Sequence, residues 1–453
     1  MITQLLNLFF IVLLLVLWIR DHRSFPRLAR QFLYLGPFLP LVSLLNHNLD
    51  HDQWGEATRV APIYVGLALL GLSLLVWRVR GAAVRLGSAE LFLLIYAGLC
   101  AAQVPGSPNP LWSLWAWSWS VPGYLLFLMA GRATSYELFY ADKLPVWAFL
   151  GFTGISLALV ATGLVTGRVD QLFHTRNLGS IYASTAMLMF VALFVGPCWR
   201  LVRHSLAWSF TFLLVSTVCM VVSLSRTAIG ALAMYAATMF TGSWAQIRRG
   251  ALASVFVLAS LAGAFLLVQE RLDLDYQLLD AWSERWRGGD YSQAYGDARY
   301  WRESKFAPFR RQIWHTEPWR GHGFGVFRYF SEYTDAHDLL VTEAFENSLL
   351  ATLFLVLSYS LPIVIRALFI AELRGLALSV LGFIVLGQLT GAMLSYRAEG
   401  CYYTPYPGWV LFYLVGFISG QLRLRGQDCA VLRTPARLLP GTDEAAALVG
   451  GAS

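Results

Sequence analysis

The residues best suited to chemistry lie in one hydrophilic stretch late in the chain, at 310–347. It contains Arg310-Arg311-Gln312-Ile313-Trp314, a Pro-Trp-Arg-Gly-His-Gly-Phe-Gly run at 318–325, then His337-Asp338 and Glu346-Asn347. Arginine binds phosphate groups through paired charge-assisted hydrogen bonds, and histidine exchanges a proton near neutral pH. If the chain has an active site, we expect it here.

A second candidate is Arg226, in the sequence Ser225-Arg226-Thr227 between two apolar runs. An arginine in hydrocarbon costs about 2.5–3.5 kcal/mol at full depth and less toward the interface, so it tends to have a partner. A topology-setting or snorkelling arginine is the alternative, but the orientation argued below puts Arg226 on the side where positive residues are not expected. Its expected ligand is an anionic head group from the outer leaflet.

The rest of the chain is apolar enough to place these residues at a membrane. Of the 453 residues, 57% are hydrophobic and only 13% are charged, and the mean hydropathy is +0.56. Apolar runs long enough to cross about 30 Å of hydrocarbon as helices recur along the sequence. We predict an all-α polytopic membrane protein with about 12–13 transmembrane helices, and fourteen spans fit the same pattern. The candidate runs are 2–19, 32–46, 62–78, 89–105, 112–131, 146–165, 179–197, 206–224, 227–243, 251–268, 347–365, 375–396 and 406–422.

Arginines set the orientation of these spans. They cluster in the linkers at 20–31, 78–85, 132, 200–203, 248–249 and 366–374 and in the tail, which predicts that these segments face the cytoplasm. The amino terminus and the long segment at 269–346 then face the other side. The net charge of +7 reports this topology, because the basic residues are scattered between spans, and it predicts no nucleic-acid partner.

The pattern divides the chain into four parts. These are the N-terminal transmembrane helices at 1–268, the outer loop at 269–346, the C-terminal transmembrane helices at 347–422 and a disordered cytoplasmic tail at 423–453. The outer loop carries fourteen acidic and ten basic side chains with five tryptophans between them. Such a mixture favours a folded cap on the membrane surface that faces carbohydrate or lipid head groups. We expect the chain to re-enter the membrane at about Asn347.

The order and spacing of these motifs resemble the O-antigen ligase and polymerase family. The resemblance covers about residues 165–365. It rests on Ser225-Arg226-Thr227 opening a span, Arg310 four residues before Trp314, the run of Pro318, Gly321, Gly323 and Gly325, and then His337. An earlier outer loop with Arg168 and Arg176-Asn177 is similar to one in the family. Asp338 and Ser348 stand where the family often has asparagine and commonly has glycine.

The resemblance implies a GT-C-like glycosyltransferase in the inner membrane of a Gram-negative bacterium, with its active site facing the periplasm. An O-antigen ligase transfers a glycan from undecaprenyl pyrophosphate to the lipid A-core oligosaccharide in lipopolysaccharide biosynthesis. The alternatives with another acceptor are an O-antigen polymerase, which joins repeat units on the lipid carrier, and a protein O-oligosaccharyltransferase. Outside the enzyme class, the alternative is a flippase or transporter for the same lipid-linked sugars. Transporters place charged residues within their spans and often consist of two structurally related halves.

The resemblance also assigns roles to residues. Negative charge builds on the lipid diphosphate as the glycosidic bond breaks, and fixed positive charge there lowers the barrier. Arg226 and Arg310 are the expected diphosphate ligands, with Arg168 and Arg176 as helpers. His337 is the expected base for the acceptor hydroxyl, and one such displacement inverts the anomeric carbon. Packing of the loop against the membrane is the alternative role for His337.

No cofactor and no metal are expected. Asp273 and Asp275 form a pair that can hold Mg²⁺ or Mn²⁺ beside a diphosphate. Such pairs are common by chance in an acidic loop, so we predict that both side chains are solvated. Gly321, Gly323 and Gly325 lack the strand and helix that flank a nucleotide-binding loop, so we interpret them as turns.

The orientation predicts opposite labelling of two single-cysteine variants. With the native cysteines removed, Ser292→Cys in the outer loop should react with an impermeant thiol reagent in spheroplasts. Ser453→Cys in the tail should react only after lysis. Labelling of the tail but not of the loop would overturn the predicted orientation.

Overall fold

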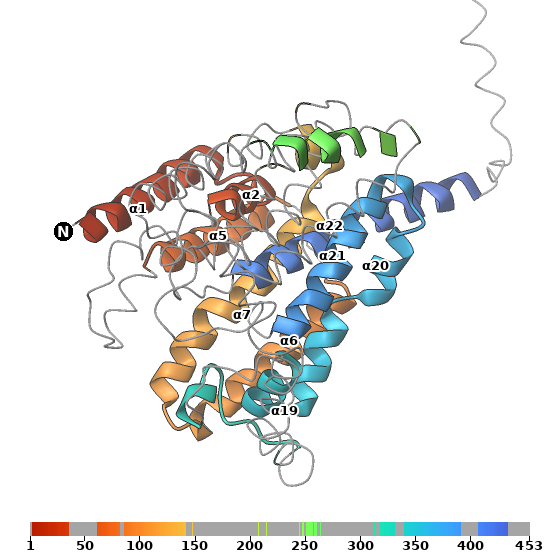
Figure 1. Cartoon of the computed structure of the whole chain (residues 1–453). Helices are drawn as coiled ribbons and strands as arrows, with labels where there is room; N and C mark the ends of the chain where they lie inside the picture. The colour runs from red at the N-terminus through yellow and green to blue at the C-terminus, as the bar shows by residue number, and fades with distance from the viewer. Residues whose placement is uncertain are drawn as a thin grey trace, which may run out of the picture.

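The computed structural model describes residues 2–35, 61–81, 86–141, 318–330, 339–390 and 406–433, together with short pieces between 147 and 312. Within these ranges all regular secondary structure is helical, and no strand occurs (Figure 1). The elements are α1 (Ile2–Asp21), α2 (Phe25–Leu35), α5 (Ala61–Val79), α6 (Ser88–Gln103), η2 (Val104–Gly106), α7 (Pro110–Ala133), α8 (Tyr136–Ala141), η6 (Phe327–Tyr329), α19 (Leu339–Ser358), α20 (Leu361–Ala367), α21 (Ala371–Thr390) and α22 (Tyr406–Arg433).

Two stretches of helix in this part of the chain are long and apolar enough to cross a membrane, Ser88–Gly106 and Leu340–Ala367. In addition, α1 exposes large apolar side chains along its length, such as Phe9 and Ile19, which are 58% and 67% exposed. A helix on the surface of a water-soluble protein keeps such residues on its buried face. The all-α class is therefore confirmed for the described residues, which also favour association with a membrane. The number of spans and their orientation stay predictions.

Contacts between side chains show how some neighbouring helices lie relative to one another. Tyr64, near the start of α5, donates a hydrogen bond to the carbonyl of Trp115, near the start of α7 (3.3 Å), so the first turns of these helices lie side by side. Phe92, near the start of α6, packs against Phe354, near the end of α19, with ring centroids 6.1 Å apart. α6 and α19 therefore run in opposite directions, as the sequence predicted for the spans that contain them.

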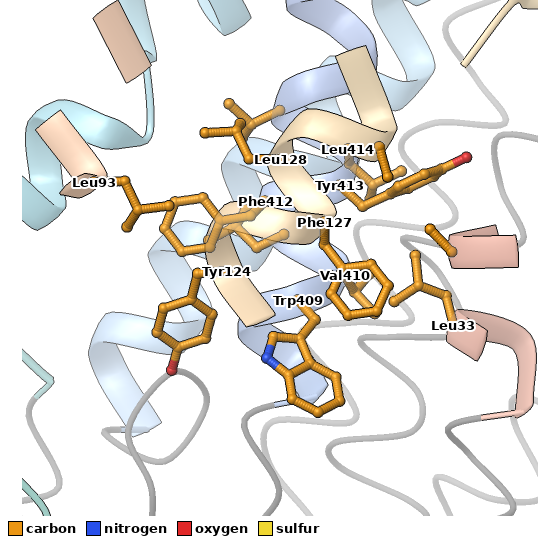
Figure 2. Close-up of a cluster of buried hydrophobic side chains, with 14 of the residues drawn as sticks. Leu33, Leu93, Tyr124, Phe127, Leu128, Trp409, Val410, Phe412, Tyr413 and Leu414 are labelled. Atoms are coloured by element: carbon orange, nitrogen blue, oxygen red, sulfur yellow. The ribbon is translucent and has the colours of Figure 1, made fainter. Parts of the chain in front are cut away.

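The contact between α7 and α22 forms the centre of the bundle. These two helices run in the same direction (Figure 2). Glycines let the two backbones approach. A side chain at Gly131 would meet the backbone of Tyr413, and one at Gly416 would meet the backbone of Leu128. Small residues at such contacts are typical of helices that pack within a membrane, where no water drives association.

Aromatic rings fill the space beside these glycines. Phe127 stacks on Trp409 with centroids 5.3 Å apart (Figure 2), and Phe32 of α2 lies 5.9 Å from Phe127 and 5.8 Å from Trp409. The indole N–H of Trp409 donates to the carbonyl of Ser120 (3.2 Å), so its polar group is satisfied inside the bundle. These contacts fix α2 against the α7–α22 pair.

A buried ion pair joins three helices where α7 ends. Arg132 lies 2.7 Å from the carboxylate of Glu90 in α6 and donates to the hydroxyl of Ser419 in α22 (3.4 Å). Glu90 also accepts from the N–H of Gly87 (3.0 Å), which caps the start of α6. Because the side chain of Arg132 is only 15% exposed, this arginine also holds helices together, although the sequence pattern assigned it to a linker.

The segment at 20–31 is not the simple linker that its arginines predicted, because α2 begins within it. The buried face of α2 is formed by Phe25, Leu28, Ala29, Phe32 and Leu33. These residues recur at the spacing of three and four that is typical of an amphipathic helix. Arg30 lies fully buried on α2 and donates to the carbonyls of Leu138 and Phe139, in the middle of α8. In this segment the spacing of apolar residues therefore predicts the structure better than the charged residues do.

Asp21 holds the turn between α1 and α2. Its carboxylate accepts from Arg20 Nε (2.7 Å) and Gln31 Nε2 (2.8 Å), and Arg27 lies 3.5 Å away. Burial raises the pKa of Asp21, but these hydrogen bonds and the two positive charges outweigh burial and bring the pKa below its ordinary value. The carboxylate therefore stays charged and fixes the start of α2 beside the end of α1.

Helical structure begins before one predicted boundary and continues past another. α19 begins at Leu339, before the expected membrane re-entry at about Asn347, and its first turns are buried against α6 and the segment at 318–330. The point of re-entry stays a prediction. α22 continues to Arg433, through the first part of the tail that we expected to be disordered. The arginines, leucines and glutamines that follow the apolar part of α22 are good helix formers, so the helix extends past the last apolar turn.

The close approach of α7 and α22 predicts opposite effects of two glycine substitutions. Gly131→Ala should lower the unfolding temperature, since the new methyl group would force the helices apart, and overpacking of this kind costs about 1–3 kcal/mol. Gly98→Ala is the matched control within α6, because a Cβ there meets nothing within 4 Å and alanine raises helix propensity. Thermal unfolding in detergent measures both variants. Equal shifts of the same sign would contradict the packing.

Candidate functional site

The candidate site lies where α6 ends and where α7 and α19 begin (Figure 1). Residues 318–330, here called the docked segment, fold against these three helix ends and contain η6. The outer loop was predicted to lie on the non-cytoplasmic side, and the alternation of the predicted spans puts the linker between α6 and α7 on the same side. The structure brings these two parts of the chain together at one end of the bundle.

α19 is interrupted at Ser348, whose φ of 81° and ψ of 158° lie in a region that is essentially restricted to glycine. The hydroxyl of Ser348 accepts from the N–H of Ala351 (3.4 Å), as an N-cap residue does. The N–H of Leu349 donates to the carbonyl of Pro318 in the docked segment (3.0 Å). The second part of α19 therefore starts as a new helix, and the docked segment holds its first turn.

The interruption also leaves backbone carbonyls of the first part of α19 without helical partners. The N–H of His322 donates to the carbonyl of Phe345 (3.2 Å), and the N–H of Gly323 donates to the carbonyl of Glu346 (2.8 Å). Because unpaired backbone groups are costly in a membrane, a break in a span requires such substitutes. The docked segment supplies them and is itself fixed by them.

The side chain of Glu346 binds the docked segment a second time. One carboxylate oxygen accepts from the N–H of Gly325 (3.0 Å), and the other accepts from the N–H of Phe327 (2.9 Å). Glu346 is 2% exposed, so this carboxylate is buried and both of its oxygens are used by the backbone of the segment. Gly325 meets it with a φ of 72°, a conformation that glycine adopts without strain.

Three further hydrogen bonds fix the docked segment to α6, α7 and the turn between them. Gln103 Oε1 accepts from the N–H of Gly321 (3.2 Å), the indole N–H of Trp112 donates to the carbonyl of Gly325 (3.0 Å), and Asn109 Nδ2 donates to the hydroxyl of Tyr329 (3.0 Å). Each bond joins residues far apart in the sequence. The segment is thus fixed to two separate parts of the bundle.

Gly323 lies against Ser107 and Ser113 with a φ of 106°. A Cβ at this position would meet the side chain of Ser107 and lie 3.0 Å from Ser113 Oγ. Only glycine therefore suits both the backbone conformation and the space. The interpretation of Gly323 and Gly325 as turn residues is confirmed by their positive φ angles.

A second buried carboxylate, that of Glu343, joins α19 to α6. It accepts from the hydroxyl of Tyr96 (2.9 Å) and from Asn347 Nδ2 (2.9 Å). Within the part of the chain that the structure describes, neither Glu343 nor Glu346 has an arginine or lysine at ion-pair distance. Ionisable groups inside a candidate span are costly, so they point to a functional role.

The docked segment presents a mixed surface at its start. Trp319 is 70% exposed and Arg320 is exposed beside it, whereas His322 packs against the rings of Phe345 and Phe330, with centroids 4.4 and 4.8 Å away. Tryptophan and arginine are typical of the boundary between hydrocarbon and water. This end of the bundle therefore has the side chains expected where a lipid head group meets the protein.

The predicted site residues Arg168, Arg176, Arg226, Arg310 and His337 lie outside the described residues, so their contacts are not tested. The acidic pair Asp273 and Asp275 lies outside them as well. Among the residues that are described, no group of three or more His, Cys, Asp or Glu side chains is arranged to hold a metal ion.

Sequence reasoning named Glu346 and Asn347 only as the end of a hydrophilic stretch, and it missed Glu343 and Tyr96. The available signal was spacing, because residues 343, 346 and 347 are three and four positions apart and share one face of a helix. The assignment of this stretch to a loop hid the helical periodicity. Nothing in the sequence of α6 distinguishes Tyr96 from an ordinary core residue.

Comparisons of the chain with protein-family models, curated proteins and solved structures find no match.

The conformation of Ser348 predicts that glycine stabilises this position. Ser348→Gly should raise the unfolding temperature, because relief of a strained backbone of this kind is worth about 1–3 kcal/mol while loss of a serine cap to glycine costs only a few tenths. Ser348→Ala removes the cap without relieving the strain, so it should lower the unfolding temperature. A Ser348→Gly protein that is less stable than the alanine variant would contradict the interrupted helix.

Proposed function

We propose that the chain is a glycosyltransferase of the O-antigen ligase type. It transfers a glycan from undecaprenyl pyrophosphate to the lipid A-core oligosaccharide at the periplasmic face of the inner membrane, in lipopolysaccharide biosynthesis. The observation that carries the proposal is the docked segment. The glycine-rich part of the motif that resembles the family is folded onto the end of the bundle by buried hydrogen bonds, rather than lying loose in a surface loop.

The conformation of Ser348 also supports the proposal. The O-antigen ligase and polymerase family commonly has glycine at this position, and here the backbone adopts a conformation that glycine favours. The sequence alone marked Ser348 as a departure from the family pattern. The structure gives the physical reason for glycine at this position, namely a break in α19 that receives the docked segment.

The proposed reaction divides the work between two kinds of side chain. Arg226 and Arg310, with Arg168 and Arg176 as helpers, bind the lipid diphosphate and stabilise the charge that it gains as the bond to the anomeric carbon breaks. His337 takes the proton of the acceptor hydroxyl as its oxygen forms the new bond. The products are the joined glycan, with inverted anomeric configuration, and the free lipid diphosphate. The proposal includes no cofactor and no metal step.

A transporter for lipid-linked sugars is the second candidate, because one observation favours it. Transporters often have interrupted helices and ionisable groups within spans, and α19 has both. However, both oxygens of Glu346 bind the backbone of the docked segment, and Glu343 bonds to Tyr96 and Asn347. These hydrogen bonds join parts of the protein, so the carboxylates support an ordered end of the bundle better than a moving substrate path.

Transfer without a gradient distinguishes the two candidates. Purified protein in detergent, incubated with a glycan on undecaprenyl pyrophosphate and with lipid A-core as acceptor, should form the joined product. Product with a second donor molecule or with a protein acceptor, but not with lipid A-core, would instead indicate a polymerase or a protein O-oligosaccharyltransferase. Movement of the donor across liposomes by protein that transfers no glycan would contradict the enzyme proposal.

The assigned roles predict different defects in variants. Arg226→Ala and Arg310→Ala should each lower the rate about 10²–10³-fold, and lysine should restore only part of it because lysine cannot form the paired contact. His337→Ala should remove transfer while donor binding stays near wild type. Arg78→Ala, an exposed arginine in the last turn of α5, is the control. Near-normal transfer by both Arg→Ala variants would exclude the diphosphate assignment, and wild-type turnover by His337→Ala would exclude the base.

A further inference from the structure

We propose that Glu346 is a positioning residue for glycan transfer, acting through the two backbone amides that it binds in the docked segment. This inference rests on the proposed function, because it assigns to Glu346 the task of fixing the loop that carries Arg310 and His337. Glu346 itself touches no reacting group in this account. Its carboxylate fixes the segment that lies between those two residues in the sequence.

The geometry requires a carboxylate at this position. The amides of Gly325 and Phe327 both point at Glu346, and each needs an acceptor. A carboxylate offers two acceptor oxygens on one carbon, whereas the amide of glutamine offers one acceptor and one donor. In a Glu346→Gln protein one of the two backbone N–H groups would therefore face another donor. The buried N–H would lose its bond, and that end of the docked segment would be released.

Glu346 lies on α19 where both its backbone and its side chain reach the docked segment. Its backbone carbonyl binds the N–H of Gly323, and its side chain binds the amides of Gly325 and Phe327. One residue thus fixes three amides along the turn. The carbonyl of Pro318 is held by Leu349 of the same helix. The docked segment is therefore fixed at its start and along its centre by the interrupted helix, and in the sequence it lies between Arg310 and His337.

Burial argues against Glu346 as an incidental feature. The residue is 2% exposed and lies in the stretch Leu340–Ala367, which is apolar enough to cross a membrane. A carboxylate in such a place is costly unless it is hydrogen-bonded, and an uninterrupted apolar helix would avoid the cost. The buried carboxylate and the interruption occur in the same helix because both are stabilised by hydrogen bonds to the docked segment.

Glu343 supplies a matched control one helical turn earlier. It is a glutamate on the same helix and is 1% exposed, but it bonds to Tyr96 and Asn347 and has no hydrogen bond to the docked segment. Replacing either glutamate by glutamine removes one potential charge from the same helix. The two variants differ in whether the docked segment loses a bond.

The experiment compares Glu346→Gln, Glu346→Asp and Glu343→Gln with the wild type in two measurements. Hydrogen exchange of the peptide that covers 318–330 should be faster in Glu346→Gln and unchanged in Glu343→Gln. The transfer rate at saturating donor and acceptor should fall about 10²-fold in Glu346→Gln, the loss expected when reacting groups are misplaced by about 1 Å. Glu346→Asp keeps both oxygens and should restore part of the rate. Glu343→Gln should keep most of the rate, because Tyr96 and Asn347 donate to the same oxygen of Glu343 and the amide oxygen of glutamine can accept both bonds.

Each outcome decides a separate point. A Glu346→Gln protein with wild-type exchange at 318–330, or with faster exchange and a wild-type rate, would reject the positioning role. An equal loss of rate in Glu346→Gln and Glu343→Gln would reduce Glu346 to a residue that only stabilises the fold. If the wild-type protein transfers no glycan, the proposed function fails and the positioning role fails with it, while hydrogen exchange still decides whether Glu346 fixes the segment.

Discussion

The candidate site depends on one exchange of backbone hydrogen bonds at the interruption of α19. A helix that crosses hydrocarbon must satisfy its own backbone groups, so a break at Ser348 is stable only if other groups replace the missing bonds. The amides of His322 and Gly323 and the carbonyl of Pro318 do this. The break is stable only when the docked segment is bound, and the docked segment binds there because the break leaves backbone groups without helical partners. This mutual dependence explains why glycines, a strained serine and a buried glutamate occur together.

The two ends of the bundle use polar groups differently. Where α7 ends, Arg132 and Glu90 form an ion pair between helices, and Asp21 has positive partners around it. At the candidate site, the buried carboxylates of Glu343 and Glu346 bind neutral donors, and among the described residues no basic side chain pairs with them. The ion pairs at the first end are typical of contacts that stabilise a fold. The second holds buried carboxyl groups in apolar surroundings, which is an arrangement more typical of functional sites.

The sequence predicted the helical class better than the contacts at this end of the bundle. Apolar run length predicted the helical class, and the glycine spacing at 321–325 predicted turns. Local patterns missed what depends on tertiary contacts. The linker containing Arg30 is partly a helix because an apolar face at three- and four-residue spacing packs on α5 and α7, and charge alone concealed it. Glu343 was missed because burial inside a bundle has no local signature in a stretch that also fits a polar loop.

The central claim is that residues 318–330 complete an interrupted membrane helix through Glu346 and the backbone on either side of Ser348. A cryo-electron microscopy map of the protein in nanodiscs tests it most directly. The account predicts density in which α19 breaks at Ser348, the amides of His322 and Gly323 face the carbonyls that precede the break, and the Glu346 carboxylate meets the turn at Gly325. A continuous helix through Ser348, with the 318–330 density separate from it, would contradict the account.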